Sequence, residues 1–451
     1  MKKLVKMISA VCAAALLSTA FVGCGSQGND QAASTTSQGD AVQTQSSGQP
    51  VTMRFSWWGG DSRHKATLDS MEAYKKKNPN VTIQGEYGGY DGYLQKLMTQ
   101  IATDSAPDLI QIDPIWTNQL GLQKDSFVDF KAEESVDLSQ FDPKVLSGFC
   151  TSNGIVLGLP MGINGFGLVV NKAFMQKYNV PLDKQWSWED IIEEGQKIHQ
   201  QDKDAYLLLM DPTQLQQIFL TDYVRSKTGK FWATDDYKIG VTKEELTDAF
   251  KMMKNLFDSG AVAPFGEVAL FDSKIDQYPK LINGQIGMNP QWSGALPSFK
   301  KIIQPDNFAI SNAIVVKDGV DQSTTYKPSM LLSVNKKSPN AAEAVKFTNW
   351  MLNDPEAALI LKDERSVPAS QAAKQALIDA NALDKDIAQM VDNTMRNPAA
   401  PVPTLLNNSE IAQITKDVCS KVVYGKQTPE QGAEELIKKV TDKMNALKAK
   451  N

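Results

Sequence analysis

Between residues 51 and 122 the sequence alternates between short β-type runs and amphipathic helical patterns. Strands are expected over residues 51–57, 81–84 and 108–112, and helices over residues 64–77, 91–102 and 115–122. An alternation of this kind builds a parallel sheet with crossover helices, so the predicted fold class is α/β. Ligands of such sheets bind at the carboxyl ends of the strands, which makes the loops after the strands the expected place for a site.

Three of these loops combine aromatic rings, glycines and hydrogen-bonding side chains. They contribute the candidate ligand-binding residues Trp58, Arg63 and His64 after the first strand, Tyr90 after the second, and Asp113 and Trp116 after the third. A sugar needs this mixture because its CH faces lie against flat rings while its hydroxyls require fixed polar partners. The pattern therefore predicts a carbohydrate-binding site at this edge of the sheet.

Several of these residues can be interpreted in more than one way. Trp57 and Trp58 are neighbours on a strand and point to opposite faces, so one of them is expected at the site, and we favour Trp58. Arg63 and His64 stand at the amino end of a helix, where anions are favoured, which suggests a ligand with a carboxylate, such as a uronate. The alternative for Arg63 is a salt bridge, and the alternative for Asp113 is a cap on the helix that follows it.

The charge and cysteine content argue against several classes of function. The net charge is −5 and no block of Lys or Arg stands out, which argues against a nucleic-acid partner. No C-x-x-C motif or Cys/His cluster is present, so neither a metal site nor a cofactor is expected. Cys150 and Cys419 could form a disulfide in an oxidising compartment or stay as buried free thiols.

The first residues predict export. Lys2, Lys3 and Lys6 precede an apolar run over residues 7–22, which is the pattern of a secretory signal peptide. A transmembrane anchor is the alternative, but a membrane span needs about 20 apolar residues and a polar tract follows this run at once.

The end of this run predicts a lipid anchor. The segment Phe21-Val22-Gly23-Cys24 resembles a bacterial lipobox, so residues 1–23 are expected to be cleaved and Cys24 to carry a fatty acyl chain such as palmitate. Residues 24–50 then form a linker rich in Ser, Gln, Gly and Thr, which cannot bury enough apolar surface to fold.

Six segments of the remaining chain match a known family in order. They are Thr52-Met-Arg-Phe-Ser-Trp-Trp-Gly-Gly, Ala73-Tyr-Lys-Lys-Lys-Asn-Pro-Asn-Val, Leu97-Met-Thr-Gln-Ile-Ala-Thr-Asp-Ser-Ala-Pro-Asp-Leu, Asn283-Gly-Gln-Ile-Gly-Met-Asn, Ser338-Pro-Asn-Ala-Ala-Glu-Ala-Val-Lys-Phe and Arg365-Ser-Val-Pro-Ala-Ser. On these segments the chain after Pro50 resembles the extracellular solute-binding proteins of family 1, the oligosaccharide-binding lipoproteins of ABC importers that include maltose-binding protein.

This resemblance implies a periplasmic-binding-protein type II fold, in which two α/β lobes are joined by crossing strands with a cleft between them. The first lobe is expected to comprise residues 51–163 plus 307–334, and the second residues 164–306 plus 335–451. A hinge motion would close the lobes on the ligand. The second lobe is expected to contribute Trp292, which matches the family's cleft tryptophan, with Asn164, Trp232 and Arg365 as further candidates.

Together these features predict a lipid-anchored substrate-binding protein on the extracytoplasmic face of the cell membrane. It is expected to act as a monomer, to capture an oligosaccharide, and to deliver it unchanged to the transmembrane subunits of an ABC permease. A surface carbohydrate-active enzyme, either a hydrolase or a lyase, is one alternative, although no G-x-S-x-G, H-E-x-x-H or P-loop motif is present. The binding subunit of a membrane sugar sensor is another, because one fold can serve either partner.

Overall fold

The computed structural model describes residues 49–90, 92–272 and 274–449. The predicted signal peptide over residues 1–23, Cys24, and all of the linker except residues 49 and 50 lie outside the described residues. Within the described part, none of the helices combines the length and the apolar content that a membrane crossing requires.

The predicted parallel β–α arrangement is present at the start of the described chain. β1 (Val51–Trp58) pairs in parallel with both β2 (Val81–Gly88) and β3 (Leu109–Ile112). The connecting helices are α1 (Asp61–Lys77) and α2 (Tyr93–Ala102). The loops after the three strands therefore meet at one edge of the sheet, as the alternation predicts.

Two antiparallel strands from later in the chain complete this first sheet. β15 (Leu331–Val334) pairs with β3, and β6 (Leu159–Pro160) pairs with β15. The order of the five strands is β2-β1-β3-β15-β6.

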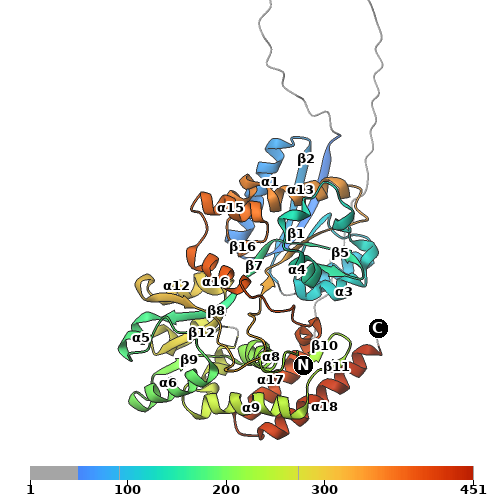
Figure 1. Cartoon of the computed structure of the whole chain (residues 1–451). Helices are drawn as coiled ribbons and strands as arrows, with labels where there is room; N and C mark the ends of the chain where they lie inside the picture. The colour runs from blue at the N-terminus through green and yellow to red at the C-terminus, as the bar shows by residue number, and fades with distance from the viewer. Residues whose placement is uncertain (1–48, 91, 273, 450–451) are drawn as a thin grey trace, which may run out of the picture. The chain divides into compact units, whose positions relative to one another are not determined.

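Three helices from the last third of the chain pack against this first lobe. They are α13 (Ala341–Asn353), α14 (Pro355–Leu361) and α15 (Gln371–Asp379). α13 and α14 contact α1, and α15 contacts α13 and α14; Figure 1 labels α1, α13 and α15 in this part of the molecule. The Tyr74 hydroxyl donates to Glu343 Oε1 at 2.7 Å, and the Phe347 ring lies 5.0 Å from that of Tyr74. The prediction that all of residues 335–451 belong to the second lobe is therefore wrong for α13 to α15.

The second sheet has four strands, in the order β13-β8-β12-β9. They are β8 (Phe166–Asn171), β9 (Tyr206–Leu208), β12 (Ile286–Trp292) and β13 (Phe308–Ser311). β13 pairs along its whole length with β8, so the prediction that placed residues 307–334 in the first lobe is wrong for β13. Strand pairing between distant segments is not encoded in local hydrophobic patterns.

Helices from both halves of the chain cover this second sheet. α6 (Trp188–Gln201) packs on β9, and α16 (Lys385–Met395) packs on β8 and β13. α9 (Lys243–Asp258), α17 (Ser409–Val423) and α18 (Pro429–Lys448) pack against one another.

Three short strands form a small sheet where the chain passes between the lobes. β7 (Gly162–Asn164) lies between β14 (Lys327–Pro328) and β16 (Val367–Pro368). β7 connects β6 of the first sheet to β8 of the second, and β14 connects β13 to β15. A Cβ at Gly162 would lie 2.0 Å from the Arg365 carbonyl oxygen, so only glycine allows this approach of two backbones. These are the expected crossing strands of a type II binding-protein fold.

The two cysteines stay apart. Cys150 lies in the hydrophobic core that includes the first sheet, and Cys419 lies in the core formed by α9, α17 and α18. Both are buried free thiols, and burial raises the pKa of Cys419 to about 12. Of the two possibilities left open by the sequence, the structure shows the free thiols.

Candidate functional site

An aromatic cluster occupies the carboxyl edge of the first sheet. It consists of Trp58 at the end of β1, Tyr90 in the loop after β2, Tyr93 at the start of α2, and Trp116 after β3. The ring of Trp58 lies 5.2 Å from that of Trp116, and Tyr90 stacks on Trp116 at 5.4 Å with an interplanar angle of 23°. Trp58, Tyr93 and Trp116 are buried, whereas Tyr90 is 43% exposed and presents the open face of the cluster. The structure thus brings Trp58, Tyr90 and Trp116 together, as predicted.

Asp113 connects this aromatic cluster to a helical cap. Its Oδ1 accepts a hydrogen bond from the Ile115 amide at 3.1 Å, and its Oδ2 accepts one from the Tyr90 hydroxyl at 3.0 Å. The capping interpretation is therefore confirmed for one oxygen, while the other faces the aromatic cluster. Burial raises the pKa of Asp113, and the hydrogen bonds and the positive charge of Lys327 partly oppose that rise.

Lys327 joins the two lobes and was not predicted from the sequence. It lies on β14 directly opposite Asn164 of β7, and its Nζ is 4.7 Å from the centre of the Trp292 ring. Burial lowers the pKa of Lys327, and the nearby carboxylate of Asp113 opposes this. A cation over an aromatic face gains about 0.5–2 kcal/mol. Lys327 thus lies over Trp292 of the second lobe and interacts electrostatically with Asp113 of the first.

Trp292 forms the wall of a cavity of about 260 Å³ in the second lobe, called here the Trp292 pocket. Gln214, Gln217 and Gln291 also line this pocket. Two of these amides are fixed from behind, because Gln291 Nε2 donates to Asn289 Oδ1 at 2.7 Å and Gln214 Nε2 donates to the Pro290 carbonyl at 2.6 Å. The pocket thus combines an aromatic plate with oriented hydrogen-bonding groups.

Gln217 is a further pocket residue that the sequence did not indicate. It belongs to a π-helical segment over Leu215–Leu220. Single turns of π-helix occur often at functional sites, because the wider turn changes the direction of a side chain. No hydrophobic pattern distinguishes such a turn from an ordinary α-helix.

Asn164, predicted as a ligand-binding residue, is not among the residues that line this pocket, but it contacts the loop that follows Trp292. The Ser293 hydroxyl donates to Asn164 Oδ1 at 3.4 Å, and a Cβ at Gly294 would be 2.9 Å from the same oxygen. Asn164 is half-buried between the loop that follows Trp292 and the strand that carries Lys327.

Arg63 is engaged by the backbone rather than presented to a ligand. Its Nε and Nη2 donate to the Glu364 carbonyl at 3.1 and 3.0 Å, and its Nη1 donates to the Trp58 carbonyl at 3.4 Å. The salt-bridge alternative is therefore replaced by contacts to carbonyl oxygens. Each of the three guanidinium nitrogens already has a partner, which argues against Arg63 as a bidentate carboxylate ligand.

His64 belongs to a separate aromatic group, called here the Trp57 group, made of Trp57, His64 and Tyr87. Trp57 Nε1 donates to His64 Nδ1 at 3.1 Å, and the His64 and Tyr87 rings are 4.5 Å apart. Because neighbouring strand residues point to opposite faces, this group lies across β1 from Trp58. The structure does not bring His64 to the aromatic cluster.

Two other predicted residues are buried. Trp232 has no exposed surface and packs within the core of the second lobe, so its prediction as a ligand-binding residue is wrong. Arg365 is 5% exposed, and it donates to Gln111 Oε1 at 3.1 Å and to the Thr67 hydroxyl at 2.8 Å. Burial and the charge of Arg63 lower the pKa of Arg365 to about 9. Gln111 in turn donates to the Trp58 carbonyl, so Arg365 supports the end of β1 from inside the protein.

A family model described as "Bacterial extracellular solute-binding protein" matches residues 69–390, which is well over half of the chain. The chain belongs to this family. The resemblance seen in the sequence is thus confirmed, and the two-lobed fold described above is that of a solute-binding protein.

Relatives of this solute-binding protein support the same assignment. A curated binding protein of Brucella abortus is 21% identical over 364 residues, covering 80% of this chain and 85% of the relative. A periplasmic solute-binding protein of Pectobacterium atrosepticum is 25% identical, with a TM-score of 0.78 over 88% of this chain and 99% of the other.

A third neighbour carries a ligand. It is a periplasmic oligogalacturonide-binding protein of Yersinia enterocolitica in complex with saturated digalacturonic acid, 24% identical, with a TM-score of 0.74 over 88% of this chain and 99% of the other. At this identity the match concerns the fold. The family and these relatives are binding proteins, which agrees with the assignment of this chain as a solute-binding protein.

Proposed function

We propose that this solute-binding protein captures an oligosaccharide between its lobes and delivers it to the transmembrane subunits of an ABC permease. One observation carries this proposal: Asp113 of the aromatic cluster in the first lobe interacts electrostatically with Lys327, whose ammonium lies over the aromatic plate of the second lobe, Trp292. On the side of the first lobe, the Tyr90 hydroxyl donates a hydrogen bond to Asp113. On the side of the second lobe, Lys327 makes a cation–π contact with Trp292.

The chemistry of these groups suits a carbohydrate. Aromatic faces pack against the CH surfaces of a sugar ring, and carboxylates, amides and ammonium groups bind its hydroxyls. Asp113 and Lys327 supply one acceptor and one donor of opposite charge, while Gln214 and Gln291 supply oriented amides. The Yersinia neighbour binds a disaccharide on the same fold.

The crossing strands give the lobes a hinge. β7 and β14 each consist of two or three residues between the two larger sheets, so a rotation of one lobe needs changes in few backbone dihedrals. Lys327 lies in this hinge, and a ligand that binds its ammonium favours one relative position of the lobes.

The lipid anchor is part of the same proposal. Acylated Cys24 would attach the protein to the outer face of the membrane, and residues 25–50 would let the lobes reach the permease. Replacing Cys24 with Ser should move the protein from the membrane fraction to the soluble fraction after cell lysis. A membrane-bound Cys24→Ser protein would contradict the anchor but not the sugar site.

Binding is tested by calorimetry with the full-length protein, solubilised in detergent, against neutral and acidic oligosaccharides. We expect at least one oligosaccharide to bind and to be recovered unchanged after incubation, and Trp292→Ala to weaken it about 30-fold or more, as for a central aromatic contact. Tyr424→Ala is the matched control, because Tyr424 is an exposed aromatic residue at the C-terminal end of α17 and lies outside the proposed site.

Two results would count against the proposal. Absence of binding to every oligosaccharide would reject the ligand class, and equal losses for Trp292→Ala and Tyr424→Ala would reject the assigned site. Cleavage of the bound oligosaccharide would favour a surface carbohydrate-active enzyme instead.

A further inference from the structure

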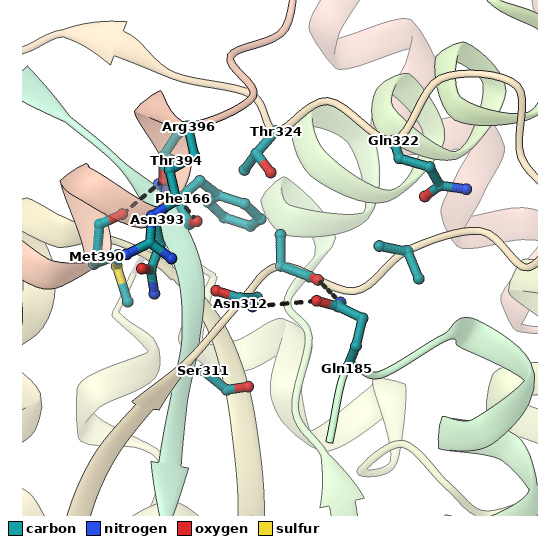
Figure 2. Close-up of a pocket in the computed structure, with 12 residues that line it drawn as sticks. Phe166, Gln185, Ser311, Asn312, Gln322, Thr324, Met390, Asn393, Thr394 and Arg396 are labelled. Carbon is teal, nitrogen blue, oxygen red and sulfur yellow. Dashed lines mark hydrogen bonds between the residues drawn. The ribbon is translucent and has the colours of Figure 1, made fainter. Parts of the chain in front are cut away.

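A second cavity is lined by Phe166, the first residue of β8. It has a volume of about 150 Å³ and is called here the Arg396 pocket. Figure 2 shows that its walls come from the start of β8, from the segment after β13, and from the end of α16. None of the predicted site residues lines it, and it is outside the site described above.

Each pocket is lined by one member of a pair of aromatic rings that contact each other. Phe166 lines the Arg396 pocket, Trp292 lines the Trp292 pocket, and their ring centres are 5.2 Å apart at an angle of 61°. The two residues lie opposite each other on β8 and β12. This ring contact and strand pairing place a wall residue of one pocket beside a wall residue of the other.

Thr394 holds the segment that carries Arg396 next to Phe166. The Thr394 hydroxyl accepts a hydrogen bond from the Phe166 amide at 2.9 Å and donates to the Met390 carbonyl at 2.8 Å. The end of α16 is thereby held against the start of β8. Arg396, two residues further on, lies at the rim of the pocket with Asn393 (Figure 2).

The two pockets carry opposite charges. Asp211 and Asp276 are the charged residues that line the Trp292 pocket, whereas Arg396 is the charged residue that lines the second. Arg396 is exposed, no ion pair or side-chain hydrogen bond engages its guanidinium among the described residues, and no carboxylate lines its pocket. An arginine fork of this kind suits a carboxylate, which it can bind through two parallel hydrogen bonds.

The rest of the lining is polar and partly oriented. Gln185 Nε2 donates to the Ala313 carbonyl at 2.8 Å, and Asn312 Nδ2 donates to Gln185 Oε1 at 3.2 Å. Amides and hydroxyls around an aromatic wall fit the hydroxyls and the CH face of one sugar ring.

We propose that the Arg396 pocket is a second sugar subsite, which takes an acidic ring of the oligosaccharide and holds its carboxylate on Arg396. This inference rests on the proposed function and adds to it the ligand class, an oligosaccharide with a uronate unit. It also moves the carboxylate contact from Arg63, whose nitrogens are engaged with carbonyl oxygens, to the second lobe.

The test compares saturated digalacturonic acid with the neutral α-1,4-linked digalactose by calorimetry on the full-length protein in detergent. We expect the acidic disaccharide to bind at least tenfold more tightly, and Arg396→Gln to reduce that preference to less than twofold. Lys301→Gln is the matched control, since it removes one positive charge from an exposed position of the same lobe outside the pocket, and it should keep the preference.

Asn393→Ala provides an independent variant of the same pocket. It should weaken both disaccharides about equally while the preference for the acidic one remains, because the amide contacts a hydroxyl and not the carboxylate. Unchanged binding in Asn393→Ala, or a preference that survives Arg396→Gln, would overturn the assignment of this pocket. If the neutral disaccharide binds as tightly as the acidic one, the inference fails while the proposed function stands; if no oligosaccharide binds, both fail.

Discussion

The two faces of β1 carry aromatic groups of similar composition whose contacts differ. In the Trp57 group, Trp57 is fully buried, its Nε1 donates to His64, and Tyr87 stacks on its ring at 4.8 Å. All three members come from β1, α1 and β2, so the contacts stay within the first lobe. In the aromatic cluster, Tyr90 donates to Asp113, whose carboxylate lies near Lys327 of the crossing strand β14.

This difference is the reason why we propose the aromatic cluster, and not the Trp57 group, as part of the ligand site. The indole of Trp57 already has its hydrogen-bond partner and its stacking partner, and a Cβ on Gly85 of β2 would lie 2.7 Å from its ring, so the space around it is full. The aromatic cluster instead ends in charged groups that reach the second lobe. Proximity to the crossing strands, and not the number of aromatic rings, therefore distinguishes the two groups.

The largest expected effect belongs to Trp57. We expect Trp57→Ala to lower the free energy of unfolding by about 3–5 kcal/mol, because it leaves a cavity in a filled core and an unpaired His64 nitrogen. Denaturant unfolding followed by circular dichroism measures this change. Ligand affinity of the folded protein should stay within about twofold of the wild-type value, because the hydrogen bond and the ring contacts described for Trp57 all lie within the first lobe. A loss of affinity without a loss of stability would show that the Trp57 group is the functional one.

Lys327 tests the connection between the aromatic cluster and the second lobe. We expect Lys327→Met, which keeps the length of the side chain, to weaken oligosaccharide binding about 10- to 100-fold, because it removes charged hydrogen bonds of about 1.5–3 kcal/mol. It also removes the charge that holds down the pKa of Asp113, so that pKa should rise further. Calorimetry measures the affinity, and Lys301→Met, an exposed position on α12 (Leu296–Ile302), is the control. If Lys327→Met and Lys301→Met bind the oligosaccharide with equal affinity, Lys327 does not link the aromatic cluster to the second lobe in ligand binding.

Local sequence patterns were enough to predict the loops of the first lobe and the separation of Trp58 from Trp57. The alternation of strand and helix located the loops, and the opposite orientation of neighbouring strand residues separated Trp58 from Trp57. The crossing strands and the type II fold followed from the family resemblance. These features depend on residues close together in the chain or on a pattern shared with known proteins.

Residues that depend on long-range contacts could not be predicted in the same way. Arg63 binds the Glu364 carbonyl, 301 residues further along the chain, and its position at a helix start gave no sign of this partner. Lys327 stands beside Asn164 only because β14 pairs with β7. Trp232 was selected for its residue type, yet tertiary packing buries it in the second core. The sequence shows which side chains are present, while the pairing of distant strands decides which of them meet.

The smallest expected effect comes from a matched pair of tyrosines. Tyr87 and Tyr90 are 50% and 43% exposed, and each packs against a tryptophan of its own group. Replacing either with Ala should therefore change the stability by similar, small amounts. We expect Tyr90→Ala to weaken oligosaccharide binding about three- to tenfold, since it removes an aromatic face and the hydrogen bond to Asp113, and Tyr87→Ala to leave the affinity unchanged. The difference between the two affinities, measured by calorimetry on the same ligand, isolates the effect of position from that of residue type. If both variants lose affinity equally, the ligand contacts both faces of β1 and the distinction between the two groups is wrong.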